Sequence, residues 1–156
     1  MSESCETSRI IPASAQSIWR VIADLTKLKD WLPIQAEMQF PNGMVAQPGV
    51  VIHIERDSPL GRVKFDQVFE RCEEPSVMVW HNKNEMLHGK PITQIKDFTT
   101  FVLLEPRPEN TTHVVVRSQW TSVGMMGTIG TNMLKPRLKK EYETALENIA
   151  KLSAQP

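Results

Sequence analysis

The histidines of this sequence, the side chains best suited to acid–base or metal chemistry near neutral pH, are few and widely spaced. Its four histidines are His53, His81, His88 and His113, and none stands in a zinc-type pattern such as HExxH or CxxC…H. His53 and His113 fall on outward rows of the expected strands, which indicates surface roles. No G-x-S-x-G, phosphate-binding or dinucleotide motif occurs. We therefore expect neither a metal nor a nucleotide cofactor.

An acid–base pair would need two titratable groups within hydrogen-bond reach of a substrate. The candidates are His81 and Glu70, and both His81 and His88 flank a strand and loop that could reach a pocket entrance. Asp24 is better explained as a helix cap than as a base. A histidine in a loop is more often simply solvated, and this is the simpler interpretation of His88.

Three polar side chains interrupt rows that are otherwise apolar: Gln67, Thr100 and Ser118. A buried amide or hydroxyl without a partner costs roughly 1–3 kcal/mol, so such groups bond each other, water or a ligand. Bonding to neighbours is the simpler interpretation. Recognition of a ligand is the functional one.

Strand alternation defines the rows that would face a core. Each row below takes every second residue of one expected strand and is the more apolar of the two choices: Val50, Ile52 and Ile54; Val63, Phe65, Gln67 and Phe69; Phe98, Thr100, Val102 and Leu104; Val114, Val116, Ser118 and Trp120. The strand at Val77–His81 offers Met78 and Trp80 against Val77, Val79 and His81, and alternation does not decide between these two rows.

The elements that carry these rows are mostly strands. After Arg9–Ile11, strands and turns run from Gln35 onward, and the further strands are expected at Val50–Arg56, Arg62–Glu73, Val77–His81, Ile92–Glu105 and Thr111–Ser122. A polar loop, Asn82–Pro91, is expected to carry Met86 and Leu87 at its tip. Hairpin spacing of seven strands predicts a continuous antiparallel sheet.

The last segment has helical spacing, with apolar residues from Tyr142 to Leu152 on one face. The helix begins either near Gly124, with a bend at Pro136, or near Asn132; the longer helix is preferred. Glycines at 124, 127 and 130 alternate with methionines, including Met126 and Met133. This stretch is either a plastic gate over a pocket, opposite Met86 and Leu87, or a flexible connector.

The segment Arg9–Pro33 has the most specific pattern. A short strand meets Pro12, Ser14 caps an amphipathic helix, and Asp24 caps a second short helix that ends at Trp31-Leu32-Pro33. This order resembles the opening of the START-like superfamily, the polyketide cyclase/dehydrase and lipid-transport (SRPBCC) group that shares the birch-pollen-allergen fold. Leu104-Glu105-Pro106 with Thr111–Val114 resembles the same family's "L-x-P…G-T-x-V" hairpin, with Asn110 in place of its glycine.

The resemblance implies an α+β helix-grip fold: a seven-stranded curved antiparallel sheet around a long C-terminal helix, with two short helices after the first strand. It also implies a cavity for a small hydrophobic molecule between sheet and helix. Combined with the inward rows, it predicts these ligand-binding residues: Ile52, Phe65, Gln67, Trp80, Phe98, Thr100, Val116, Ser118, Trp120, Met126 and Met133. No catalytic residue is predicted.

Composition limits the classes of function. The chain has 156 residues and equal numbers of basic and acidic side chains, 18 each, so we expect one domain over residues 1–156 and no nucleic-acid partner. The basic run Lys135–Lys140 is followed at once by Glu141 and Glu143, which indicates a solvated helix face with mixed charge. Cys5 and Cys72 suit free thiols in a reducing cytoplasm, and no apolar run suggests a leader or a membrane span. A monomer or homodimer is expected.

Three functions remain open. The first is a carrier or sensor for a small apolar or amphipathic molecule, with a polar anchor from Gln67, Thr100 or Ser118. The second is a cyclase- or dehydratase-like enzyme that uses the same cavity, which requires an acid–base pair there. The third is an interaction module that resembles the family's chaperone-ATPase activators and acts through its surface.

Overall fold

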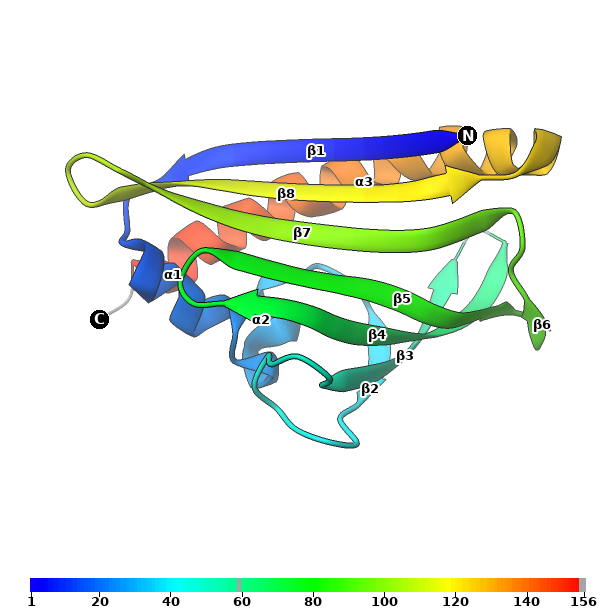
Figure 1. Cartoon of the computed structure of the whole chain (residues 1–156), viewed down its shortest axis with the longest axis horizontal. Coiled ribbons are helices and arrows are strands. Elements are labelled where there is room, and N and C mark those ends of the chain that lie inside the picture. Colours follow the sequence, from blue (N-terminus) through cyan, green and yellow to red (C-terminus); the bar gives the residue numbers. More distant parts are fainter. Residues whose placement is uncertain (59, 155–156) are drawn as a thin grey trace.

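A curved antiparallel sheet packs against one face of a long C-terminal helix in the computed structural model, which describes residues 1–58 and 60–154 (Figure 1). The strand order is β1-β8-β7-β5-β4-β3-β2, and the short β6 pairs with β5. The helix-grip fold predicted from the sequence is therefore confirmed. The strands are β1 (Ser2–Ile11), β2 (Ala36–Gln39), β3 (Val51–Ser58), β4 (Gly61–Glu73), β5 (Val77–Leu87), β6 (Lys90–Pro91), β7 (Ile95–Arg107) and β8 (Thr111–Ser122).

The short helices follow β1 as expected: α1 (Ala15–Ile22), the single 3₁₀ turn η1 (Leu25–Lys27) and α2 (Leu28–Trp31). The Ser17 amide donates to Ser14 Oγ at 3.1 Å, and the Thr26 amide donates to Asp24 Oδ1 at 3.1 Å. Both predicted caps are confirmed, and Asp24 is occupied as a cap. The apolar faces of these helices are buried in the core.

Three strands differ from the sequence expectation. β1 begins at Ser2 instead of Arg9, and β7 begins at Ile95 instead of Ile92. The segment expected to be a loop at Asn82–Pro91 instead continues β5 to Leu87, which pairs with Val63 of β4. The polar residues at 82–85 give no alternating pattern, so the sequence does not indicate a strand there. Backbone pairing with β4 nevertheless extends the strand. Met86 and Leu87 are consequently strand residues and not a loop tip.

The helix α3 (Gly124–Ser153) is continuous through Pro136, so the longer of the two expected helices is confirmed. Its C-terminal half packs against α1 and α2, and Asn148 Nδ2 donates to the Trp31 carbonyl at 3.3 Å. Ala145, Leu146 and Ile149 are buried there. No helix within residues 1–58 and 60–154 is both long and apolar enough to span a membrane.

The first turns of α3 lie close to the chain that precedes β7. The Val123 amide donates to the Gln94 carbonyl at 2.8 Å. A Cβ added to Gly127 would lie 2.7 Å from the same carbonyl oxygen, so only glycine fits there. Gly127 thus serves close packing.

The inward rows predicted from alternation are the rows that face the core: Ile52, Ile54, Phe69, Val102, Leu104, Val114, Val116 and Trp120 are all buried there. On β5 the inward residues are Met78 and Trp80. Val79 is also buried, but outside the core cluster. It is paired with Phe101 on the outer side of the sheet, which explains why alternation does not decide this strand.

Candidate ligand cavity between the sheet and the C-terminal helix

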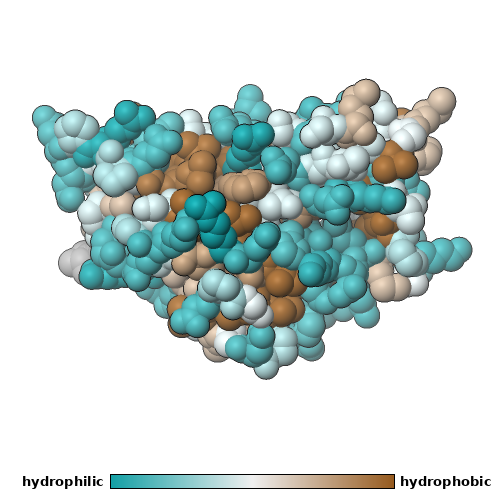
Figure 2. Space-filling model, in the orientation of Figure 1, coloured by the Kyte–Doolittle hydropathy of each residue, from teal (hydrophilic) through white to brown (hydrophobic). Residues whose placement is uncertain are grey.

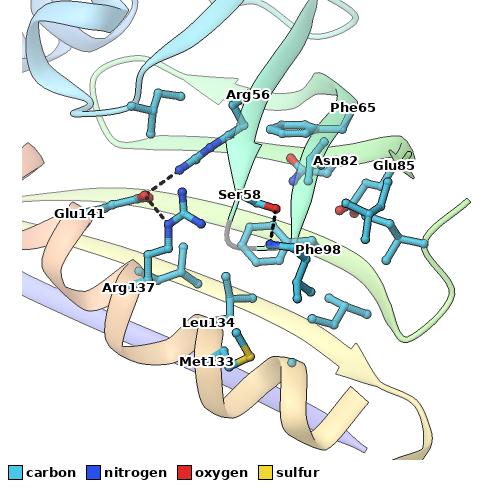
Figure 3. A pocket seen from close by; sticks show the side chains of 18 of the residues that line it. Arg56, Ser58, Phe65, Asn82, Glu85, Phe98, Met133, Leu134, Arg137 and Glu141 are labelled. Atoms are coloured by element: carbon cyan, nitrogen blue, oxygen red, sulfur yellow. Dashed lines mark hydrogen bonds and ion pairs between the residues drawn. The ribbon is translucent and has the colours of Figure 1, made fainter. Parts of the chain in front are cut away.

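A cavity of about 400 Å³ separates α3 from the sheet. Its walls come from β3, β4, β5 and β7, from the chain after α2, and from the part of α3 between Met126 and Tyr142. Figure 3 shows the side chains converging from these elements on a common space. The volume falls within the roughly 300–1,000 Å³ of small-molecule sites. The helix is held by α1 and α2 at its C-terminal end, and the cavity lies beneath its other half.

The predicted ligand-binding residues fall into two groups. Seven of them line the cavity: Phe65, Gln67, Trp80, Phe98, Thr100, Met126 and Met133. The other four are inward but do not line it: Ile52, Val116, Ser118 and Trp120. These four belong to the solid core, because alternation finds the inward face of a strand but does not find where along that face the helix leaves space.

The hydroxyls of Thr100, Ser118 and Tyr142 form a buried chain. Thr100 Oγ1 lies 2.8 Å from Ser118 Oγ, and Ser118 Oγ is hydrogen-bonded to the Tyr142 hydroxyl. Burial raises the pKa of Tyr142 to about 12, so the phenol stays protonated. The polar groups predicted on β7 and β8 therefore satisfy one another and tie the sheet to α3. For Ser118, which does not line the cavity, this arrangement matches the simpler interpretation, in which a buried hydroxyl bonds its neighbours.

Trp120 and Phe98 form a second link between the sheet and α3. Trp120 Nε1 donates to Thr131 Oγ1 at 3.0 Å, and its ring stacks on Phe98 with 5.5 Å between ring centroids. Phe98 therefore presents one face to the core and also lines the cavity.

Gln67 is the buried polar side chain of the cavity that lacks a partner. It is 4% exposed and lines the cavity, and its Nε2 atom finds no hydrogen-bond acceptor among the residues that the structure describes. An amide left in this state costs roughly 1–3 kcal/mol. A ligand acceptor would remove that cost.

Glu85 is a cavity residue that sequence reasoning missed. It lies on β5 among apolar wall residues such as Leu87 and Ile92, and its carboxyl makes no hydrogen bond or ion pair with the described part of the chain. Burial raises its pKa to about 7. The sequence pattern places this residue in an exposed loop, so only recognition that β5 continues past His81 would have found it.

Three charged side chains, Arg56, Arg137 and Glu141, form another part of the cavity wall, and we call them the charged group. Glu141 Oε1 accepts from Arg56 Nη2 at 2.9 Å and from Arg137 Nε at 3.3 Å (Figure 3). Arg56 comes from β3, whereas the other two lie one turn apart on α3. These residues also escaped the sequence analysis, because the charge pattern around Arg137 and Glu141 indicates a solvated helix face.

The acid–base pair considered from the sequence does form, but elsewhere. His81 Nδ1 lies 3.0 Å from Glu70 Oε2, and neither residue lines the cavity, because His81 follows the inward Trp80 and so faces the outer side of the sheet. This candidate pair therefore lies outside the cavity. No group of three metal-ligating side chains occurs within the described residues.

The outer face of the sheet is largely hydrophilic, with apolar patches between the polar side chains (Figure 2). Exposed apolar side chains also gather on the first turns of α3, where Met125 is 79% and Met126 is 63% exposed. Met126 belongs to both surfaces, since it lines the cavity as well. Leu60 is exposed at the cavity too, and His88 Nε2 lies 2.9 Å from its carbonyl.

Known proteins share this architecture. The family model described as "Polyketide cyclase / dehydrase and lipid transport" matches residues 2–154. No protein of curated function matches the sequence.

Similar solved structures extend the fold match over the whole chain. A norcoclaurine synthase point mutant from Thalictrum, in complex with a transition-state analogue, is 12% identical with a TM-score of 0.75, over 98% of this chain and 94% of that one. The Zhui aromatase/cyclase from Streptomyces is 12% identical with a TM-score of 0.73, over 98% of this chain and 94% of that one. Protein TTHA0849 from Thermus thermophilus is 14% identical with a TM-score of 0.73, over 97% of both chains.

Proposed function

Because this chain belongs to the polyketide cyclase/dehydrase and lipid transport family, we propose that its cavity binds a small hydrophobic or amphipathic molecule, as a carrier or sensor. The observation that carries the proposal is the cavity itself. Its walls are mainly apolar and a few polar groups converge on it, as in most small-molecule sites.

The volume of the cavity, about 400 Å³, is large enough for a small molecule. Because the walls are mainly apolar, a ligand that buries apolar surface against them gains roughly 25 cal/mol per Å². Gln67 supplies a hydrogen-bond donor that can orient such a ligand.

The proposal is tested by filling the cavity. Leu134 lines it from α3, and Leu134→Trp should place a bulky ring in the space that a ligand would occupy. Titration with the neutral fluorescent probe prodan should show saturable binding to the natural protein and at least about tenfold weaker binding to Leu134→Trp. The matched control is Ile10→Trp, which adds the same side chain on β1, where Ile10 is 62% exposed. Equal binding by all three proteins would contradict the proposal.

Glu85 favours a second candidate function, a cyclase- or dehydratase-like enzyme. A general acid or base works best when its pKa lies near the working pH, and burial places the pKa of Glu85 at about 7 in an apolar environment. The carboxyl would exchange a proton with a bound substrate. No comparable observation supports the interaction-module alternative.

A further inference from the structure

The charged group on the cavity wall carries an excess of positive charge. Arg56 and Arg137 both donate to the same oxygen of Glu141, and these two contacts are the only ion pairs that the two arginines make with the described residues. Two guanidinium groups and one carboxylate leave a net charge of +1. Each guanidinium has five N–H donors, so most of their donors remain free for another partner.

This charge is partly withdrawn from water. The side chains of Arg56 and Glu141 are only 17% and 15% exposed, and that of Arg137 is 35% exposed. An uncompensated charge is costly in such a position unless it is paired. All three residues line the cavity, so the group that would compensate the charge has access from the cavity side.

The other ionisable carboxyl of the cavity does not compensate it. Glu85 makes no ion pair within the described chain, and in Figure 3 it lies on the opposite side of the opening from Arg137, with Ser58 and Phe98 between them. The cavity is therefore electrically asymmetric. It has a cationic end at Arg56 and Arg137, an apolar middle, and a carboxyl on the far wall.

We propose, resting on the ligand-binding function above, that the ligand is an amphipathic carboxylate whose head group binds Arg56 and Arg137 while its apolar body fills the cavity. A carboxylate fits for two reasons. Its planar pair of oxygens matches the guanidinium fork. Its single negative charge neutralises the +1 of the group, whereas a phosphate monoester would bring nearly two.

The experiment compares three probes with one alkyl chain and different heads: decanoate, decanol and decylammonium. Each is titrated calorimetrically at about pH 7.5, low ionic strength and concentrations below micelle formation. Decanoate should bind about tenfold more tightly than decanol, and decylammonium more weakly than both. Arg137→Met should reduce the preference for decanoate over decanol to about threefold or less. The matched control Arg107→Met removes an arginine that pairs with Glu105 outside the cavity and should leave the preference unchanged.

A second variant distinguishes ligand recognition from a structural ion group. Glu141→Gln removes the carboxylate that competes for both guanidinium groups, so it should increase the preference for decanoate. If the group only fastens α3 to β3, this variant would lose stability without any gain in that preference. This prediction also stands if Arg137→Met fails to fold.

The outcomes separate the two proposals. Decanol binding as tightly as decanoate, or an unchanged preference in Arg137→Met, would overturn the carboxylate inference and leave the binding function standing. No binding of any of the three probes would overturn both.

Discussion

Glu85 shows how position, more than residue type, sets the pKa of a carboxyl group. Glu70 and Glu105 lie on strands of the same sheet, yet both pair with histidines at an exposed surface. Glu85 instead faces an apolar wall because β5 continues beyond His81. Burial then disfavours the ionised carboxylate, which raises the pKa of Glu85 to about 7.

This raised pKa makes the stability of the protein depend on pH. The unfolded chain releases the Glu85 proton near pH 4.5, whereas the folded protein keeps it until about pH 7. Its contribution is therefore fully present below pH 4.5 and is lost as the pH rises to about 7. The loss is up to about 3 kcal/mol.

Glu85→Gln should accordingly remove most of the decrease in unfolding free energy between about pH 5 and pH 8, as measured by urea denaturation. Glu70→Gln is the matched control, since Glu70 is on the outer side of the sheet and 60% exposed. The same pH slope in the Glu85→Gln variant and in the natural protein would show that the carboxyl ionises normally. It would also remove the main support for the enzyme candidate.

At the scale of elements, glycine residues that look alike in the sequence have different roles in α3. The sequence suggests a thin, easily opened stripe at Gly124, Gly127 and Gly130. In the structure, Gly127 is buried against the Gln94 carbonyl, whereas a Cβ on Gly130 would meet only the end of the Ile95 side chain, at 3.3 Å. Spacing alone does not separate a flexible glycine from one required by close packing.

The two positions should therefore respond differently to alanine. Gly127→Ala forces a methyl group against a backbone carbonyl and should lower the unfolding free energy by about 1–3 kcal/mol. Gly130→Ala should be neutral or should stabilise the helix by up to about 1 kcal/mol, because Ile95 can adjust. Thermal unfolding of both variants measures the difference. Loss of stability in Gly130→Ala that equals the loss in Gly127→Ala would contradict this assignment.

Much of the element order could be predicted because it rests on local signals. The caps at Ser14 and Asp24, the inward rows and the long helix all follow from short-range patterns, and the structure agrees with them. The extension of β5 could not be predicted from its own side chains, since residues 82–85 are polar and show no alternation; it follows from pairing along the length of β4, the other strand of the same hairpin. The same pairing puts Asn82 and Glu85 in the cavity wall.

For the whole molecule, the relation between sheet and helix determines the site. The C-terminal half of α3 is packed on α1 and α2, while its other half leaves about 400 Å³ beside β3, β4, β5 and β7. The sequence analysis selected seven lining residues, five on strands and two on α3, but it also selected four that lie in the solid core. Where the cavity begins depends on the helix position, which no single strand encodes. The charged wall at Arg56, Arg137 and Glu141 likewise appears only when β3 meets α3.

The most direct test of the central claim is an NMR titration that observes isotope-labelled methionine methyl groups, using decanoate and decanol as ligands. Met126 and Met133 line the cavity, whereas Met44 is exposed and does not line it. If a ligand enters between the sheet and α3, the Met126 and Met133 signals should shift together and saturate, with the Met44 signal unchanged. Signals of Met126 and Met133 that stay unmoved up to the solubility limit of both ligands, or that move no more than the Met44 signal, would contradict the account.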